Sequence, residues 1–401
     1  MIISRPIRIV RNVGTKLATC DPESHRVARD KNGHIYFSFI DKRGNVYVAR
    51  SCQPNVLGGQ WTIQRIFGHK ALLANLKVAK FGAALAIDKE HNELSLVVCE
   101  KTSHSCVYTR CILRELGNVT NVENWYADGT SNPTTIGYAK VGSIGEGNQS
   151  LCTVEHDKVG NAILSFSTLK QNTFSVELTK FQDQWLKSIT IDQDQNYCWA
   201  SSLYLDNNND LHIAYESYKD NTVRHKQACL EDCMNPTEWK STNKEKDFDH
   251  ALHHRTKPCR AFSMQGNNYG KVYFVGHTAP QKRAATDILY NILDTKKGEW
   301  LFDEKENCGK IASVGYFNTY GYPQVGILGE IPVVVYTREG SDGRLHATKN
   351  LKENIYIGPT KTYYPCLEKE NAKELSVIFT KKNLFNYNIF GFTIFSRKRF
   401  R

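Results

Sequence analysis

Short apolar runs, each preceded by a polar turn, recur along the whole chain. Segment 30–39 opens with the turn Asp-Lys-Asn-Gly and continues as the almost wholly apolar Ile-Tyr-Phe-Ser-Phe. Segments 157–166 and 206–215 have the same length and the same pattern. Asp, Asn and Gly suit tight turns, and a short strand that is apolar at nearly every position is buried on both faces. The pattern therefore predicts short, doubly buried β-strands, and no long stretch shows helical periodicity.

Seven copies of this unit can be counted. They lie at 30–39, 88–98, 157–166, 206–215, 269–275, 329–335 and 373–379. In the better-preserved copies a second turn follows, then an alternating strand such as 46–49 or 223–226, and then a tryptophan. Five of the six tryptophans keep this spacing: Trp61, Trp125, Trp185, Trp239 and Trp300. Four strands repeated at a period of roughly 57 residues indicate a β-propeller.

We therefore predict an all-β protein, a seven-bladed β-propeller of four-stranded antiparallel blades that forms a single domain over 1–401. The blades are expected at 15–67, 78–128, 145–192, 196–243, 255–305, 320–358 and 362–396, with a basic tail at 397–401. The last blade provides only three strands, and segment 5–12 would supply the fourth. Pairing of the chain's beginning with its end would close the ring and remove exposed sheet edges.

Composition supports a folded chain. Of 401 residues, 40% are hydrophobic and 23% are charged, which suffices for a real core and excludes a wholly disordered or fibrous protein. No apolar run is long enough for a transmembrane helix, and the first residues lack the apolar core of a secretory signal. We expect a soluble protein, cytoplasmic or exported by an unrecognised route.

The twelve cysteines are scattered, with no zinc-type spacing. Disulfides and buried thiols remain equal alternatives, and no cofactor or metal is expected. The formal net charge of +11 favours an anionic partner, such as an acidic polysaccharide. No Lys/Arg-rich segment interrupts the body of the chain, so a nucleic acid is not the expected partner. The bland alternative is a basic protein whose charge has no specific role.

Residues that recur in every copy are interpreted as structural, and those that do not recur are candidates for function. His25 and Arg26 precede the first inner strand, and Arg260 lies at the start of the fifth. Arginine can hold a carboxylate through two parallel hydrogen bonds.

A histidine-rich segment between the fourth and fifth blades contains His250, His253 and His254. Imidazoles near carboxylates suit general acid–base catalysis close to neutral pH. The spacing matches no known zinc motif. The alternative interpretation is a polar surface loop.

Aromatic side chains near one rim of the ring could stack on sugar rings. The candidates are Tyr320, Tyr322, Tyr363, Tyr364 and Trp199. In an enzyme, Tyr363 would join Arg26 and the three histidines as a catalytic residue. The same tyrosines also fit ordinary rim packing, because the chain contains 20 of them.

The turn, apolar strand and tryptophan pattern resembles the sialidase-like propellers with BNR repeats. Their motif Ser-x-Asp-x-Gly-x-x-Trp is nowhere intact, and its nearest remnant runs from Ser51 to Trp61. This broad group contains glycoside hydrolases, polysaccharide lyases and lectins. A sialidase would need three convergent arginines, which position alone assigns to Arg26, Arg260 and Arg338, together with a Tyr/Glu pair and an Asp acid.

Three functions remain open on the sequence. The first is a lectin-like module that binds carbohydrate. The second is a sialidase-like glycoside hydrolase or a polysaccharide lyase. The third is a scaffold for protein–protein interaction. The incomplete repeat motif and the basic charge favour the first.

Overall fold

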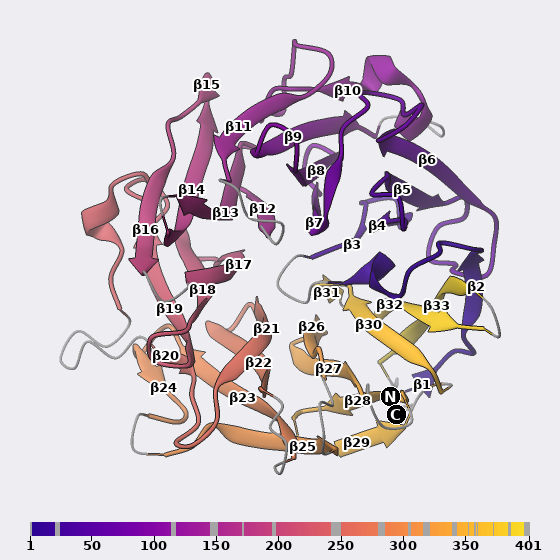
Figure 1. Ribbon diagram of the computed structural model, residues 1–401. Coiled ribbons are helices and arrows are strands. Elements are labelled where there is room, and N and C mark those ends of the chain that lie inside the picture. Colours follow the sequence, from indigo (N-terminus) through magenta and orange to yellow (C-terminus); the bar gives the residue numbers. More distant parts are fainter. Residues whose placement is uncertain are drawn as a thin grey trace.

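The computed structural model places seven antiparallel sheets around a central axis, and it confirms the seven-bladed β-propeller (Figure 1). It describes the chain except for residues 1, 21–24, 114–117, 145–150, 171, 195–197, 242–249, 280–284, 304–305, 316–320, 339–342, 352, 357, 359, 372, 384–385 and 397–401. Short 3-10 helices η1 (Lys16–Thr19), η2 (Asn118–Thr120), η3 (Val122–Asn124) and η4 (Pro236–Glu238) are the helical elements of the described chain.

The innermost strands line the axis in chain order. They are β3 (Val27–Arg29), β7 (Val78–Asp88), β12 (Cys152–His156), β17 (Cys198–Leu205), β21 (Cys259–Gly266), β26 (Gln324–Leu328) and β30 (Thr362–Leu367). The second strands are β4 (Ile35–Ile40), β8 (Glu93–Glu100), β13 (Ala162–Lys170), β18 (Asp210–Ser217), β22 (Lys271–Thr278), β27 (Ile331–Thr337) and β32 (Glu374–Lys382).

The third strands are β5 (Val46–Ser51), β9 (Ser105–Ile112), β14 (Thr173–Gln182), β19 (Thr222–Cys229), β23 (Thr286–Asp294), β28 (Leu345–Lys349) and β33 (Tyr387–Phe395). The outer positions hold β6 (Trp61–Phe67), β10 (Trp125–Tyr126), β11 (Ala139–Ser143), β15 (Gln184–Trp185), β16 (Ile189–Asp194), β20 (His250–Leu252), β24 (Glu299–Trp300), β25 (Gly309–Gly315) and β29 (Glu353–Tyr356). Strand β31 (Glu370–Asn371) pairs with β26 in parallel and joins the last two blades.

The repeated turn aspartates hold the hairpins between the first and second strands. One carboxylate oxygen of Asp30 accepts hydrogen bonds from the backbone N–H groups of Asn32 (2.9 Å) and His34 (2.8 Å). Asp157 and Asp206 accept the equivalent pairs of bonds in their own blades. Satisfying these turn amides explains why the aspartate recurs.

The chain's beginning closes the ring, as predicted. Strand β2 (Ile7–Val10) pairs antiparallel with β33, and β1 (Ile2–Ile3) extends the same edge (Figure 1). A buried ion network strengthens this closure. Arg29 of the first blade donates two hydrogen bonds to Glu368 of the last blade, at 2.9 and 3.0 Å, and also contacts Glu374.

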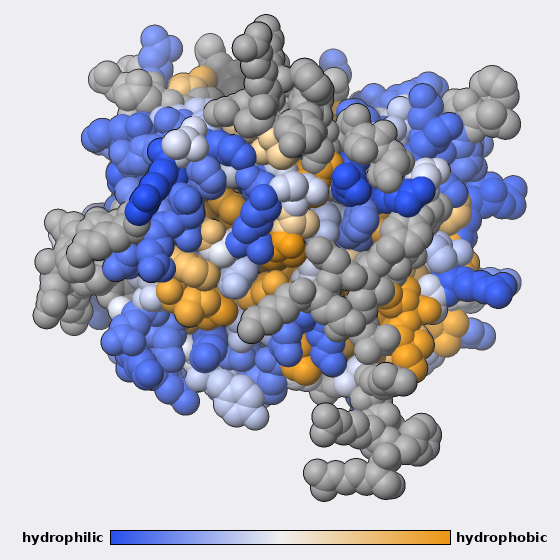
Figure 2. All heavy atoms as spheres, turned by 90° about the horizontal axis from the view of Figure 1, so that it is seen from below, coloured by the Kyte–Doolittle hydropathy of each residue, from blue (hydrophilic) through white to orange (hydrophobic). Residues whose placement is uncertain are grey.

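The core lies between adjacent blades. All six residues of β4 and all eight of β8 are buried, as expected for strands covered on both faces. Tyr36 and Val48 of the first blade pack in one cluster with Leu85 and Leu96 of the second. At the edge of the ring the visible surface is mainly hydrophilic, with separate hydrophobic patches (Figure 2).

The eleven cysteines whose side chains are described are all free thiols, and most are buried. This observation favours the thiol alternative for that part of the chain. No helix in the described part of the chain has the length and apolar character needed to cross a membrane.

Candidate functional site

The two rims of the ring carry different sets of side chains. We call the rim at which the innermost strands begin the start rim, and the opposite one the end rim. Several ionisable and aromatic side chains meet at the start rim on the fourth to seventh blades. They come from the end of β18, from β21, from the end of β22, and from the beginnings of β26 and β30.

Glu216, near the end of β18, is the buried acid of this group. Its Oε1 accepts a hydrogen bond of 2.6 Å from the backbone N–H of Ala261, and its Oε2 lies 3.9 Å from Nε of Arg260. Burial raises the pKa of Glu216 to about 7, although the charge of Arg260 opposes the shift. The carboxyl group therefore titrates near neutral pH, where a general acid is most effective.

Replacement of Glu216 by Gln should change how stability depends on pH. The folded protein keeps a proton on Glu216 between pH 4.5 and about 7, whereas the unfolded chain releases it. The free energy of unfolding therefore falls as the pH rises through this window, by roughly 3 kcal/mol at 1.36 kcal/mol per pKa unit. Gln keeps the oxygen that accepts from Ala261 and cannot ionise.

Urea denaturation at pH 4 and pH 8 checks this prediction. We expect Glu216→Gln to match the unmodified protein at pH 4 and to exceed its stability at pH 8. A stability difference that is the same at both pH values would show that the carboxyl group does not titrate in this range.

Arg260 is held in place by its neighbours. Its guanidinium lies 3.6 Å from the centre of the Tyr218 ring, a close cation–π contact. Nη2 donates to Oδ1 of Asn221 at 2.9 Å, and Nη1 donates to the carbonyl of Cys259 at 2.6 Å. The side chain is 12% exposed. A planar, pre-positioned guanidinium suits bidentate recognition of a carboxylate or sulfate.

The backbone at this rim is strained in three adjacent blades. Ala261, Tyr322 and Tyr364 adopt positive φ angles of 44°, 41° and 47°. Ala261 lies in a bulge of β21, where the register shifts between Arg260 and Ser263. Strained non-glycine residues and bulges are concentrated at functional sites, where they aim side chains.

His277 adds a neutral imidazole beside Arg260, its partner across the strand pair. Its Nδ1 donates to the carbonyl of Thr278 at 2.9 Å, so Nε2 carries the lone pair. Burial lowers the pKa of His277 to about 4. The ring of Tyr322 meets that of His277 edge-on at 5.7 Å and lies 4.4 Å from the ring of Tyr364.

Two of the other predicted start-rim residues lie deeper. His25 and Arg26 are fully buried, and Arg26 donates to the carbonyl of Ala18 at 3.4 Å. Burial, reinforced by the charge of Lys369, lowers the pKa of His25 well below its usual value. Tyr363 is half-buried against Tyr387.

The three predicted histidines lie in or directly after β20, the outer strand of the fourth blade. His250 lies in β20, with Nε2 3.9 Å from Asp220. The Nε2 of His253 donates to two backbone carbonyls on the outer side of the fifth blade, at 2.8 and 2.6 Å. His254 accepts from the backbone N–H of Thr256. Tyr320 and the side chain of Trp199 lie outside the described residues.

Sequence reasoning missed Glu216, Tyr218 and His277. A signal for one of them was present. Glu216 follows the turn residue Asp206 by ten positions, where the first copy has Ile40 and the third copy has Ser167. An ionisable residue at a repeat position that is uncharged in those copies is the kind of departure that marks a site.

The start-rim cluster thus combines a carboxyl group that titrates near neutral pH, a neutral imidazole, a fixed guanidinium and two tyrosine rings in contact. Among the described residues no group of three or more His, Cys, Asp or Glu side chains is arranged to hold a metal ion. The chemistry available here is binding of anionic and hydroxyl groups and transfer of protons.

Comparison with known proteins finds solved structures of the same fold. No protein-family model matches the sequence, and no curated protein matches it. A PL25 ulvan lyase bound to a glucuronic acid–sulfated rhamnose disaccharide superposes with a TM-score of 0.59, 11% identity, and coverage of 96% of this chain and 95% of the other. The polysaccharide lyase Uly1 superposes with a TM-score of 0.56 at 10% identity, over 99% of this chain and 100% of the other. AofleA from Arthrobotrys oligospora superposes with a TM-score of 0.51 at 9% identity, over 89% of this chain and 92% of the other. At these identities the chain shares with them the β-propeller fold.

Proposed function

We propose that this protein recognises carbohydrate through the start rim, and that the sugar carries a carboxylate or sulfate. The observation that carries the proposal is the pre-positioned guanidinium of Arg260 beside Glu216, His277 and the contacting tyrosines. The basic net charge of +11 supports an anionic ligand. Two of the structural neighbours are described as polysaccharide lyases, which is consistent with this ligand class.

Binding would combine an ionic contact with contacts to the sugar ring. The guanidinium pairs with the anionic substituent, and the tyrosine faces and edges contact the C–H surface of the sugar ring. Glu216 accepts or donates a hydrogen bond to a hydroxyl group, depending on its protonation. Lectin-like binding needs no more than this.

Replacement of Arg260 by Ala should weaken the binding of a uronic acid oligosaccharide. Hydrogen bonds to charged groups contribute about 1.5–3 kcal/mol, so the affinity should fall roughly tenfold to a hundredfold. Titration calorimetry in physiological salt measures this. The matched control is Arg65→Ala, because Arg65 also stacks on a tyrosine, Tyr47, but lies on the outer strand of the first blade.

Equal binding by Arg260→Ala and the unmodified protein would contradict the proposal. Equal weakening by Arg260→Ala and Arg65→Ala would show that only net charge matters. Failure of every acidic and neutral glycan to bind would favour a scaffold for protein partners.

A second candidate function is cleavage of the same sugar. The pKa of Glu216 near 7 and the neutral His277 are the observations in its favour. In an elimination, a base such as Nε2 of His277 takes the proton α to the carboxylate. The bond to the leaving oxygen then breaks, and protonated Glu216 supplies that oxygen with a proton. Prolonged incubation with uronic polysaccharides, followed by the ultraviolet absorbance of an unsaturated uronate, distinguishes turnover from binding.

A further inference from the structure

The end rim contains two cavities, of about 610 and 280 Å³. They share Arg29, Lys89 and Asn268 in their walls, so they adjoin each other, and together we call them the hollow. The lining residues come from all seven blades. They include Glu155 and His156 on the third blade and Glu330 on the sixth. This hollow is separate from the start rim, because it collects the residues at which the innermost strands end.

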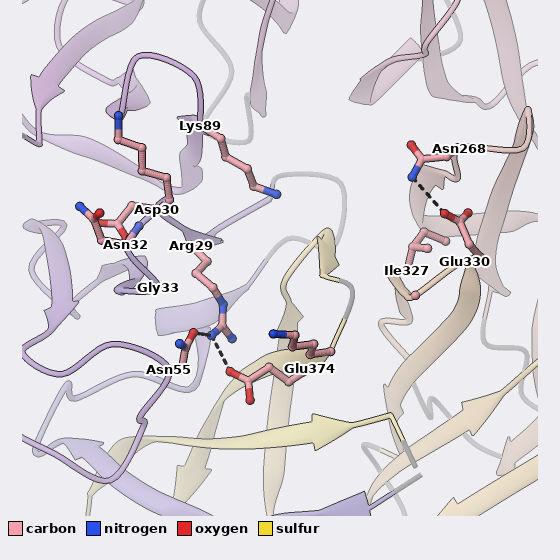
Figure 3. Close-up of a pocket in the computed structure, with 13 residues that line it drawn as sticks. Arg29, Asp30, Asn32, Gly33, Asn55, Lys89, Asn268, Ile327, Glu330 and Glu374 are labelled. Carbon is pink, nitrogen blue, oxygen red and sulfur yellow. Dashed lines mark hydrogen bonds and ion pairs between the residues drawn. The ribbon is translucent and has the colours of Figure 1, made fainter. Parts of the chain in front are cut away.

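The walls of the larger cavity differ in charge. Arg29, Lys31, Lys89 and Lys373 line it from the first, second and seventh blades. Figure 3 shows Lys89 and Arg29 on one side, and the pair Asn268 and Glu330 on the other. Arg29 donates to Glu368, Glu374 and Asn55, and the three lysines add positive charge to the lining around it.

The opposite wall is organised by amides. Asn207 donates to Oδ1 of Asn268 at 3.1 Å, and Asn268 donates to Oε1 of Glu330 at 3.0 Å. These two hydrogen bonds fix the orientation of the Glu330 carboxylate. Glu330 lies across the hollow from Lys89 (Figure 3).

Two buried acceptors in the lining receive no hydrogen bond from any described residue. They are Oε2 of Glu330 in the larger cavity and Oε1 of Gln265 in the smaller one. A buried acceptor without a donor costs about 1–3 kcal/mol, and buried polar groups in native proteins almost always have a partner. Hydroxyl groups of a ligand would satisfy both atoms.

From these features we propose that the end rim carries a second carbohydrate site, distinct from the start rim, for a saccharide that combines hydroxyl groups with an anionic substituent. The carboxylate or sulfate lies against Lys31, Lys89 and Lys373. The hydroxyl groups of the saccharide donate to Glu330. Where the saccharide extends into the smaller cavity, they also donate to Gln265. Two sites on opposite rims let one molecule hold two segments of a polysaccharide, which raises the apparent affinity for long chains.

The test uses the full-length Arg260→Ala protein, in which the start rim is disabled. A heparin hexasaccharide at physiological salt is the probe, and maltohexaose is the neutral comparison. The triple change Lys31→Gln, Lys89→Gln and Lys373→Gln should lower hexasaccharide affinity at least tenfold. The charge-matched control changes three exposed lysines outside the cavity lining, Lys187, Lys296 and Lys297, to Gln, and should lower it less than twofold.

Glu330→Gln separates a specific site from general attraction. This change makes the protein more positive, so charge alone would strengthen hexasaccharide binding. The proposal predicts weaker binding by severalfold, because an acceptor oxygen is lost. Stronger or unchanged binding by Glu330→Gln, an equal loss in both lysine triples, or no binding by the Arg260→Ala protein would each overturn the second site. Because the start rim is disabled in every variant, these outcomes do not depend on the function proposed for it.

Discussion

Replacement of Arg29 by Met is expected to lower the free energy of unfolding by about 3–5 kcal/mol, the usual cost of leaving buried charges without their partner. Arg29 is 5% exposed and joins the first blade to Glu368, Glu374 and Ser376 of the last. Met fills much of the same volume but leaves Glu368 buried, at 2% exposure, without its counterion. Chemical denaturation measures the loss.

Arg110→Met is the matched control for the position of this network. Arg110 is equally buried and pairs with Asp88 and Glu93, but all three lie in the second blade. Both variants should lose stability, whereas hydrogen exchange should speed up selectively along β2, β33 and β30 only in Arg29→Met. A loss below about 1 kcal/mol, or identical exchange patterns, would contradict a closing role for Arg29.

Acidification from pH 6.5 to pH 4 is expected to destabilise the protein strongly. Burial lowers the pKa of His277 to about 4, and burial also lowers the pKa values of His25, His156 and His225 well below the usual value. In this range the unfolded chain binds protons that the folded protein excludes. His277 alone would remove roughly 3 kcal/mol at 1.36 kcal/mol per pKa unit, and the other three act in the same direction.

The slope of unfolding free energy against pH gives the number of protons taken up on unfolding. We expect an uptake of several protons near pH 5, partly offset by the proton that Glu216 releases on unfolding. His277→Asn, which can still donate to the carbonyl of Thr278, should reduce the uptake by about one proton. Equal unfolding free energy at pH 7 and pH 4.5 would show that these histidines are not held neutral.

The fold was predictable because the sequence repeats the same turn and apolar strand along the chain. A turn aspartate such as Asp206 needs only nearby backbone amides, and the apolar strand after it needs only a neighbouring blade. Ring closure was also predictable, because the last blade lacked a strand that the start of the chain could supply.

The candidate site was less predictable because its properties depend on contacts between blades. The pKa of Glu216 rises because β21 of the next blade buries it, and the positive φ angles of Tyr322 and Tyr364 leave no mark in the sequence. Arg260, Tyr322 and Tyr364 were nominated from their position, and the structure places them on adjacent blades. The loop histidines were nominated for their chemistry, and the backbone carbonyls bound by His253 could not be foreseen.

The most direct test of the central proposal is a crystal structure of the protein with a uronic acid oligosaccharide bound. The account predicts that the carboxylate of the sugar pairs with the guanidinium of Arg260, with a sugar ring against Tyr322 and a hydroxyl group beside Glu216. A sugar that leaves the start rim empty and binds elsewhere, with the affinity of Arg260→Ala unchanged, would contradict it.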